Sequence, residues 1–272
     1  LFDIIRIGRD NWIQNKWNLK ELKKLFEQQS NVKYFNWPTV FLNNHDNPRS
    51  VSKYGNDLQF REKSAKLLAM LILTQKGTPV LFQGEEIGMT NYKFESLDQF
   101  DDLEVIGNLP KAIKSRINKK EYLKHLNISS RDHSRTTMQW NNKIHGGFTE
   151  GNNNWFLTNS NYSSINVEND LKNINSIFHF YKSLIDLRKK SNDLIYGNYQ
   201  DLDPTNESLF IYQRKGKQFC YLVILNMSNA SLKYNFNNLT KYSLELSNRT
   251  SDLNFFSDDI DLLPWDALLF KK

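Results

Sequence analysis

The stretch FLNNHDNPR at residues 41–49 decides the fold. Residues 39–44 are apolar and β-forming, and Pro48 then stops regular pairing, so a buried strand is expected to run into a polar loop. The stretch GTPVLFQGEEIGM at residues 77–89 repeats this arrangement, with an apolar strand at 79–82. Strands without polar alternation are typical of a sheet covered on both faces. The two stretches therefore predict parallel strands with functional loops at their carboxyl ends.

Helical patterns flank these strands. Residues 19–29 repeat leucine and phenylalanine at helical spacing, and residues 61–76 are a long apolar-faced helix closed by Gly77. A charged, partly helical excursion at 97–127 is followed by a loop rich in Asn, Gly and Trp and by an amphipathic helix at 176–190. Helix and strand alternate, which is the order of a parallel α/β arrangement.

The pattern changes near Leu194 to short alternating segments separated by Asn, Ser and Gly turns, which predict a small antiparallel β domain. We expect strands at residues 208–214, 219–227, 232–236, 242–246 and 267–270. The domain boundary is placed between residues 1–191 and residues 192–272.

Composition excludes several classes of protein. The 272 residues carry 36 Lys and Arg against 30 Asp and Glu, and this net charge of +6 is spread along the chain, so nucleic-acid binding is not expected. No apolar run is long enough to cross a membrane. The single cysteine, Cys220, excludes an internal disulfide and a cysteine-based zinc site, and the histidines show no metal-ligand spacing. We expect no metal and no cofactor.

The first polar loop has the residue types for binding a polyhydroxylated substrate. His45, Asp46 and Arg49 lie within five residues directly after the buried strand. These three side chains can hydrogen-bond to sugar hydroxyls, and the carboxylate can place negative charge near a developing cation. The alternative is a structural loop in which Asp46 caps the turn and pairs with Arg49.

Several motifs taken together indicate a protein family far more specifically than either loop does alone. FLNNHDNPRSVSKYGND, GTPVLFQGEEIGMTN, SRDHSRTTMQW, GGFT and INVE, before the helix SIFHFYKSLIDLRK, resemble the α-glucosidases of glycoside hydrolase family 13. The nearest branch is that of the oligo-1,6-glucosidases and glucan 1,6-α-glucosidases. The resemblance covers residues 17–190 and extends more loosely through the β domain.

The resemblance implies a (β/α)8 TIM barrel followed by a C-terminal antiparallel β-sandwich. Residues 39–44 then correspond to barrel strand seven and residues 79–83 to strand eight, and FDIIRI at 2–7 is at most a remnant of strand six. The chain would be the second half of the barrel plus the sandwich, because a full barrel needs about 250 residues. The family's nucleophilic Asp follows strand four and its general-acid Glu follows strand five. Neither strand is present, so the chain alone is expected to be inactive.

The resemblance also assigns roles around the sugar. Asp46 matches the third carboxylate of the family site, which stabilises the transition state by accepting hydrogen bonds from the 2- and 3-hydroxyls of the sugar, and His45 shares this role. Arg131 matches a ligand for the far end of the same glucose, although a pair with Asp132 or another loop acid is the alternative. Glu104 is either an acceptor-side carboxylate or a solvent-facing charge.

Other residues favour structural interpretations. Glu85 and Glu86 suggest an acid/base pair, but adjacent side chains in extended backbone point apart, and an architectural role is preferred. Trp140, Phe148 and Trp155 either stack on sugars or pack loops onto the barrel. Asn47, Thr137 and the pair Asn154–Trp155 depart from the family pattern, which leaves linkage and chain-length preference open.

The functional prediction is a fragment of a retaining α-glucosidase that removes terminal α-1,6-linked glucose from isomalto-oligosaccharides or short glucans. One alternative is a trehalose-6-phosphate hydrolase, for which the basic run at 111–124 would bind phosphate if it is not simply a solvated helix face. A second is a non-catalytic, glucosidase-like domain that binds a partner protein. The expected partners are an oligosaccharide and the missing N-terminal half of the enzyme. Because no signal peptide is seen, the expected location is cytoplasmic.

Overall fold

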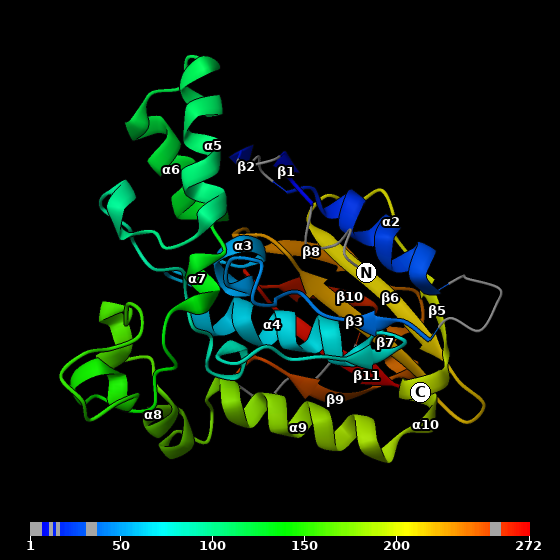
Figure 1. Cartoon of the computed structure of the whole chain (residues 1–272). Coiled ribbons are helices and arrows are strands. Elements are labelled where there is room, and N and C mark those ends of the chain that lie inside the picture. Colours follow the sequence, from blue (N-terminus) through cyan, green and yellow to red (C-terminus); the bar gives the residue numbers. More distant parts are fainter. Residues whose placement is uncertain (1–6, 11–12, 15–16, 31–36, 251–256) are drawn as a thin grey trace.

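A computed structural model of the protein describes residues 7–10, 13–14, 17–30, 37–250 and 257–272 (Figure 1). Its helices are α2 (Leu19–Ser30), α3 (Ser50–Tyr54), α4 (Arg61–Thr74), α5 (Leu103–Lys114), α6 (Lys119–Ser129), α7 (Asp132–Arg135), α8 (Val167–Lys172), α9 (Ile177–Lys190) and α10 (Asn192–Tyr196). Its strands are β1 (Arg9–Asp10), β2 (Ile13–Gln14), β3 (Thr39–Val40), β4 (Thr78–Pro79), β5 (Asn198–Asp201), β6 (Leu209–Lys215), β7 (Cys220–Asn226), β8 (Leu232–Asn235), β9 (Ser243–Ser247), β10 (Asp259–Leu262) and β11 (Ala267–Lys271).

The first part of the chain holds the two parallel strands that the sequence predicts. Within the described residues β3 pairs with β4 alone, with Thr39 opposite Thr78 and Val40 opposite Pro79. Both strands are shorter than expected, because regular pairing ends at Val40 and Pro79, before the polar loops begin. Phe41 and Leu42 continue β3 as buried but irregular backbone. The possible strand at residues 2–7 lies almost entirely outside the described residues.

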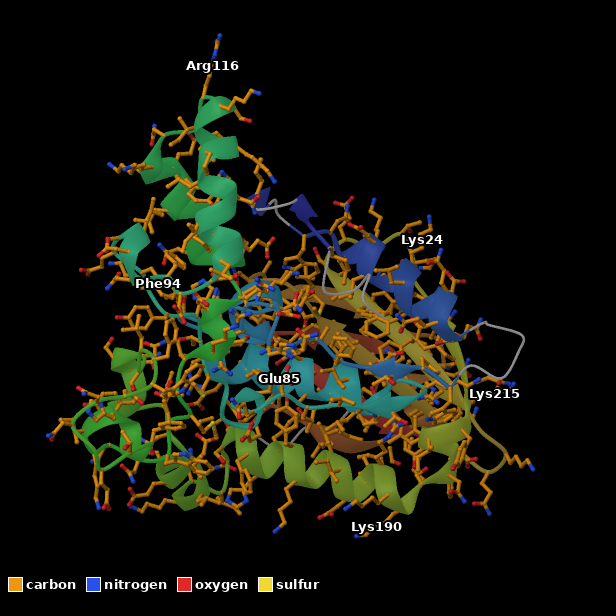
Figure 2. All side chains as sticks on the ribbon, viewed as in Figure 1. Lys24, Glu85, Phe94, Arg116, Lys190 and Lys215 are labelled. Atoms are coloured by element: carbon orange, nitrogen blue, oxygen red, sulfur yellow. The ribbon has the colours of Figure 1, made fainter. Side chains whose placement is uncertain are left out.

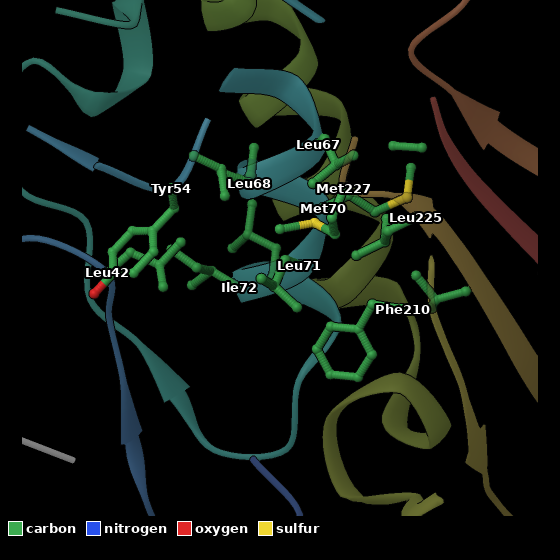
Figure 3. Close-up of a cluster of buried hydrophobic side chains, with 14 of the residues drawn as sticks. Leu42, Tyr54, Leu67, Leu68, Met70, Leu71, Ile72, Phe210, Leu225 and Met227 are labelled. Carbon is green, nitrogen blue, oxygen red and sulfur yellow. The ribbon is translucent and has the colours of Figure 1, made fainter. Parts of the chain in front are cut away.

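Helix α4 is the centre of the molecule. Every residue from Ser64 to Thr74 is buried, as expected for a helix that is apolar all round. Figure 3 shows Leu42 and Tyr54 on one side of α4, and Phe210, Leu225 and Met227 on the other. The sequence predicts only one apolar face for this helix, and its complete burial arises because the β sheet covers its second side.

The C-terminal part is the expected antiparallel β structure. Five strands pair in the order β5-β6-β7-β11-β9, and β8 pairs with β10 in a small second sheet. Alternate residues of β6 face opposite ways, so that Phe210 packs toward α4 while Leu209 and Ile211 pack toward β10. Two cores thus lie on the two faces of one sheet. The sequence missed β5 and β10, which have four residues each and bury only one and two of them, respectively.

Two buried arginines join the α/β part to the β sheet. Arg188 of α9 donates to the carbonyl oxygens of Leu73 and Gln75 at 2.7 and 2.8 Å. Arg214 of β6 donates to Thr74 O and, at 2.8 Å, to Gly197 O. These carbonyls belong to the last turn of α4 and nearby loops, where helix geometry leaves oxygens without an internal partner. The guanidinium groups therefore tie the end of α4 to the sheet.

One feature stands apart from the body of the molecule. The helices α5 and α6 form a hairpin that projects beyond the rest of the fold, with Arg116 at its tip (Figures 1 and 2). Its small core includes Val105, Tyr122 and Leu126. No helix among the described residues is long and apolar enough to cross a membrane.

Candidate functional site

The loop after β3 is shaped by its asparagines. The Asn44 side chain accepts hydrogen bonds from the backbone N–H of Asp46 at 2.9 Å and from the Asn47 amide at 2.5 Å. Such an asparagine-centred turn is a stable local alternative to continued strand. It leaves Asp46 with a side chain that is 45% exposed, at the point where the strand has just ended.

Asp46 is surrounded by basic groups from two loops. One carboxylate oxygen lies 3.4 Å from Arg131 Nη1 and 3.5 Å from Arg135 Nη2. The other lies 3.3 Å from His45 Nε2. Because the carboxylate is half-exposed and oriented by two guanidinium groups, it can accept hydrogen bonds from an incoming hydroxyl without moving.

Arg131 is held from behind by a buried carboxylate. Its Nε donates to Asp102 at 2.6 Å and its Nη2 donates to the second oxygen of Asp102, which is a bidentate pair. Glu104 approaches Nε at 3.4 Å and is partly exposed. These hydrogen bonds from Asp102 raise the pKa of Arg131 despite partial burial. Burial would raise the pKa of Asp102, but the Arg131 bonds and charge bring it below its ordinary value.

A further carboxylate fixes the segment that carries Asp102. The Asp132 side chain is fully buried and accepts from the backbone N–H groups of Asp101 and Asp102 at 2.9 and 3.0 Å. It also lies 3.4 Å from Arg135 Nη1. The loop acid that pairs with Arg131 is therefore Asp102, whereas Asp132 orients the backbone and the second arginine.

Arg49 does not belong to this cluster. It is 1% exposed and donates to the carbonyl oxygens of Gln83 at 2.7 Å and His133 at 3.1 Å. Neither expectation for this residue holds, because it neither faces a substrate nor pairs with Asp46. Its guanidinium points inward, where it joins the loops that follow β3, β4 and α7.

Glu85 and Glu86 follow β4 in the chain, and Glu85 lies near the middle of the molecule (Figure 2). The Glu85 carboxylate accepts from Phe82 N at 2.9 Å, and that of Glu86 accepts from Gly84 N at 2.7 Å. Burial raises the pKa of Glu85 to about 7. Both carboxylates stabilise the turn between them and β4, which agrees with the architectural role and not with an acid/base pair.

The remaining motif residues are distributed over the surface. Trp140, Phe148 and Trp155 are 49%, 41% and 64% exposed, so none of the three is a buried packing residue. The basic side chains at 111–124 are exposed on the α5–α6 hairpin, which fits a solvated helix face. Among the residues that the structure describes, no cluster of three His, Cys, Asp or Glu is placed to hold a metal ion.

Comparison with known proteins identifies the family. The family model described as the α-amylase catalytic domain matches residues 4–197. The chain belongs to the α-amylase family. Within this family it is 36% identical to the oligo-1,6-glucosidase of Bacillus cereus, a match that covers 100% of the chain and 50% of that protein. It is 38% identical to the glucan 1,6-α-glucosidase of Streptococcus pneumoniae, over 96% of the chain and 48% of that protein.

Solved structures share the fold. The isomaltulose synthase of Klebsiella sp. LX3 is 37% identical and superimposes with a TM-score of 0.93, over 99% of this chain and 50% of that one. The chain thus spans about half the length of the relatives it matches. A partial catalytic domain followed by an antiparallel sheet, as the sequence predicts, is confirmed.

Sequence reasoning missed two members of the cluster. Arg135 lies in the motif SRDHSRTTMQW and Asp102 lies two residues before Glu104, but the sequence analysis gives neither a functional role. The available signal was their position two or four residues from a candidate residue, Glu104 for Asp102 and Arg131 for Arg135. Which of two adjacent acids faces Arg131 depends on backbone direction, and that is set by Asp132 across the loop.

Proposed function

We propose that this chain is the C-terminal half of a retaining α-glucosidase that releases terminal glucose from short α-1,6-linked glucosides. The observation that carries the proposal is the half-exposed carboxylate of Asp46, held between Arg131, Arg135 and His45. It lies directly after a parallel strand, where active sites of α/β barrels occur. Family membership supports the reaction class, and the glucosidase relatives support the substrate class.

Each group has a distinct role in this proposal. The Asp46 carboxylate accepts hydrogen bonds from the 2- and 3-hydroxyls of the glucose at the cleaved bond, and these bonds strengthen as the ring flattens toward an oxocarbenium ion. His45 donates to the same sugar. Arg131, fixed in orientation by Asp102, donates to the far end of the ring. Because Asp102 holds Arg131 before substrate arrives, little reorganisation is needed on binding.

Glu104 is proposed to contact the sugar on the acceptor side. It lies 3.4 Å from Arg131 and is only partly buried, so its carboxylate is accessible beside the bound glucose. The nucleophile and general acid are assigned to the N-terminal half of the enzyme, and the chain alone is expected to be inactive. We also propose that the domain boundary lies between residues 191 and 192 and that the protein is cytoplasmic.

A phosphorylated substrate is the second candidate. The chain is 40% identical to the trehalose-6-phosphate hydrolase of Escherichia coli over 81% of its length. Against this, the lysines of residues 111–124 are exposed on a projecting hairpin and do not converge on the Asp46 cluster. A non-catalytic binding domain is disfavoured, because protein binding does not require a fixed arginine–carboxylate cluster at the strand ends.

The test compares the 272-residue chain with a complete enzyme that contains it. Isomaltose, trehalose 6-phosphate and sucrose are supplied separately, and the products are identified by chromatography. Sucrose is included because an isomaltulose synthase among the similar structures was crystallised with it. We expect glucose from isomaltose with the complete enzyme and no turnover by the chain alone. Cleavage of trehalose 6-phosphate in preference to isomaltose would contradict the substrate assignment.

A further inference from the structure

A cavity of about 730 Å³ lies outside the Asp46 cluster. Its two walls are far apart in sequence, since one is formed by residues 98–101 and the other by residues from 144 to 162. Cavities of this size are typical of small-molecule sites. None of the residues given a role under the proposed function lines this cavity.

The lining combines an aromatic face with carboxylates. Trp155 is 64% exposed and lines the cavity together with Asp98 and Asp101, both of which are exposed. Indole faces pack against the apolar face of a sugar ring, and carboxylates accept hydrogen bonds from its hydroxyls. Within the described part of the chain, no lysine or arginine lines the cavity, and His145 is the sole basic residue there. The lining therefore suits a neutral polyol and disfavours a phosphate or nucleotide.

Local hydrogen bonds hold the second wall in place before any ligand arrives. His145 is a non-glycine residue with a left-handed φ of 56°, and it is followed by Gly146 at 64° and Gly147 at 69°. Such backbone is costly for a residue with a side chain and persists only where surrounding contacts fix it. Here Gly146 O accepts from the backbone N–H groups of Trp140 and Asn141 at 2.7 and 3.1 Å. The rim is thus preorganised by main-chain bonds.

The position of Trp155 is fixed in the same way. The Asn154 amide donates to Thr158 Oγ1 at 2.6 Å and to Thr137 Oγ1 at 3.2 Å. Its oxygen accepts from Trp155 N at 3.1 Å. The backbone at Trp155 is therefore anchored through its neighbour, at the point where the exposed indole lines the cavity.

One dipeptide connects the cavity to the Asp46 cluster. The backbone N–H groups of Asp101 and Asp102 both donate to Asp132, yet Asp102 binds Arg131 while Asp101 lines the cavity. The two sites therefore lie on opposite sides of the same short backbone segment. A sugar chain whose terminal glucose reaches Arg131 would have its further units close to this second site.

We propose that the cavity binds sugar units of a neutral glucan, with Trp155 as the stacking platform and Asp98 and Asp101 as acceptors for hydroxyls. This inference deepens the proposed function and rests on it for the choice of glucan. The cavity would favour substrates longer than a disaccharide, either by holding distal units of the cleaved chain or by binding a separate stretch of polymer.

The test is electrophoresis of the folded 272-residue chain in native gels that contain soluble dextran, against gels without polysaccharide. We expect dextran to retard the chain. Trp155→Ala should weaken the apparent affinity about tenfold, which is the value of one good stacking contact. Trp140→Ala is the matched control, because Trp140 is also exposed but does not line the cavity. Circular dichroism verifies that each variant folds.

The Asp46→Asn variant separates the two sites. Retardation that persists in Asp46→Asn and is weakened in Trp155→Ala supports the cavity, even if no hydrolytic activity is ever found in the complete enzyme. Equal retardation of the wild-type chain and Trp155→Ala would overturn the proposal, as would an absence of retardation. Isomalto-oligosaccharides of increasing length, used as competitors, distinguish the sources. Stronger competition with each added glucose unit indicates one continuous chain, and competition that is independent of length indicates a separate polymer site.

Discussion

Two sites in this protein use arginine side chains for different purposes, one to face a ligand and one to satisfy buried carbonyl groups. At the strand ends, Arg131 is 27% exposed and binds the carboxylate of Asp102 while facing Asp46. At the joint with the β sheet, Arg214 is fully buried and binds only backbone carbonyls, together with Arg188. Burial lowers the pKa of both joint arginines to about 10, whereas the Asp102 bonds raise that of Arg131.

The difference separates a site for binding from a site for stability. Carboxylates at the strand ends orient Arg131 and keep it accessible, so its donors can serve a ligand. The carbonyls at the joint belong to the end of α4 and to the loop before β5, and they would be unsatisfied without the guanidinium groups. We therefore expect variants of the first region to affect activity with little change in stability, and variants of the second to do the reverse.

The largest expected effect is that of Asp46→Asn in the complete enzyme. We expect kcat to fall about a thousandfold, with a much smaller change in KM, because its hydrogen bonds matter most in the transition state. The free energy of unfolding should change by less than about 0.5 kcal/mol, since the residue is half-exposed. Steady-state kinetics on isomaltose and urea unfolding measure the two quantities. A loss confined to KM would contradict the assignment.

Arg214→Met tests the joint between α4 and the β sheet. Methionine fills much of the volume but leaves the carbonyls of Thr74, Ile195 and Gly197 without their donor. We expect the free energy of unfolding to drop by about 3 kcal/mol. Arg116→Met at the tip of the exposed hairpin is the control and should change it by less than about 0.5 kcal/mol. Urea titration measures both, and a loss below about 1 kcal/mol for Arg214→Met would show that the joint is not stabilising.

Glu85→Gln tests a buried carboxylate that belongs to neither arginine site. Because burial raises the folded-state pKa of Glu85 to about 7, the folded chain binds a proton more readily than the unfolded chain. The stability of the wild-type chain should therefore fall as the pH rises from about 4.5 to 7. Glutamine removes this dependence, so the variant should gain about 2 kcal/mol relative to the wild type between pH 5 and pH 8.

Unfolding free energies at pH 5, 6, 7 and 8 measure this gain. Glu121→Gln, on the exposed side of α6, is the matched control. Parallel pH profiles for the wild-type chain and Glu85→Gln would show that Glu85 is not the titrating group.

The smallest expected effect is that of Asp102→Asn. Asparagine keeps the shape but loses the charge and one of the two hydrogen bonds to Arg131, so Arg131 becomes less well oriented. We expect KM for isomaltose to rise about tenfold in the complete enzyme, with a smaller fall in kcat. Kinetics of Asp101→Asn on the same disaccharide provide the control, because Asp101 does not contact Arg131. An unchanged KM in Asp102→Asn would show that Arg131 does not need the Asp102 carboxylate for its orientation.

Most of the fold could be predicted from the sequence, and the errors have physical causes. The helices α4 and α9 and the strands β6, β7 and β11 were expected within a few residues of their bounds, because each carries a strong apolar pattern. The strands β5 and β10 were missed because only one or two of their residues are buried. The complete burial of α4 was missed because a sequence does not show that one sheet covers a helix from the second side.

The sequence by itself determined the family, the order of α/β and β parts, and the choice of His45, Asp46, Arg131 and Glu104 as candidate residues. These conclusions depend on local patterns and motifs, which can be recognised without knowing which residues are neighbours in the folded chain. The tertiary structure alone decided that Arg49 points inward, that Asp102 holds Arg131, and that Asp101 lines a second cavity with Trp155. The direction of each side chain depends on partners distant in sequence, and these meet only when the chain folds.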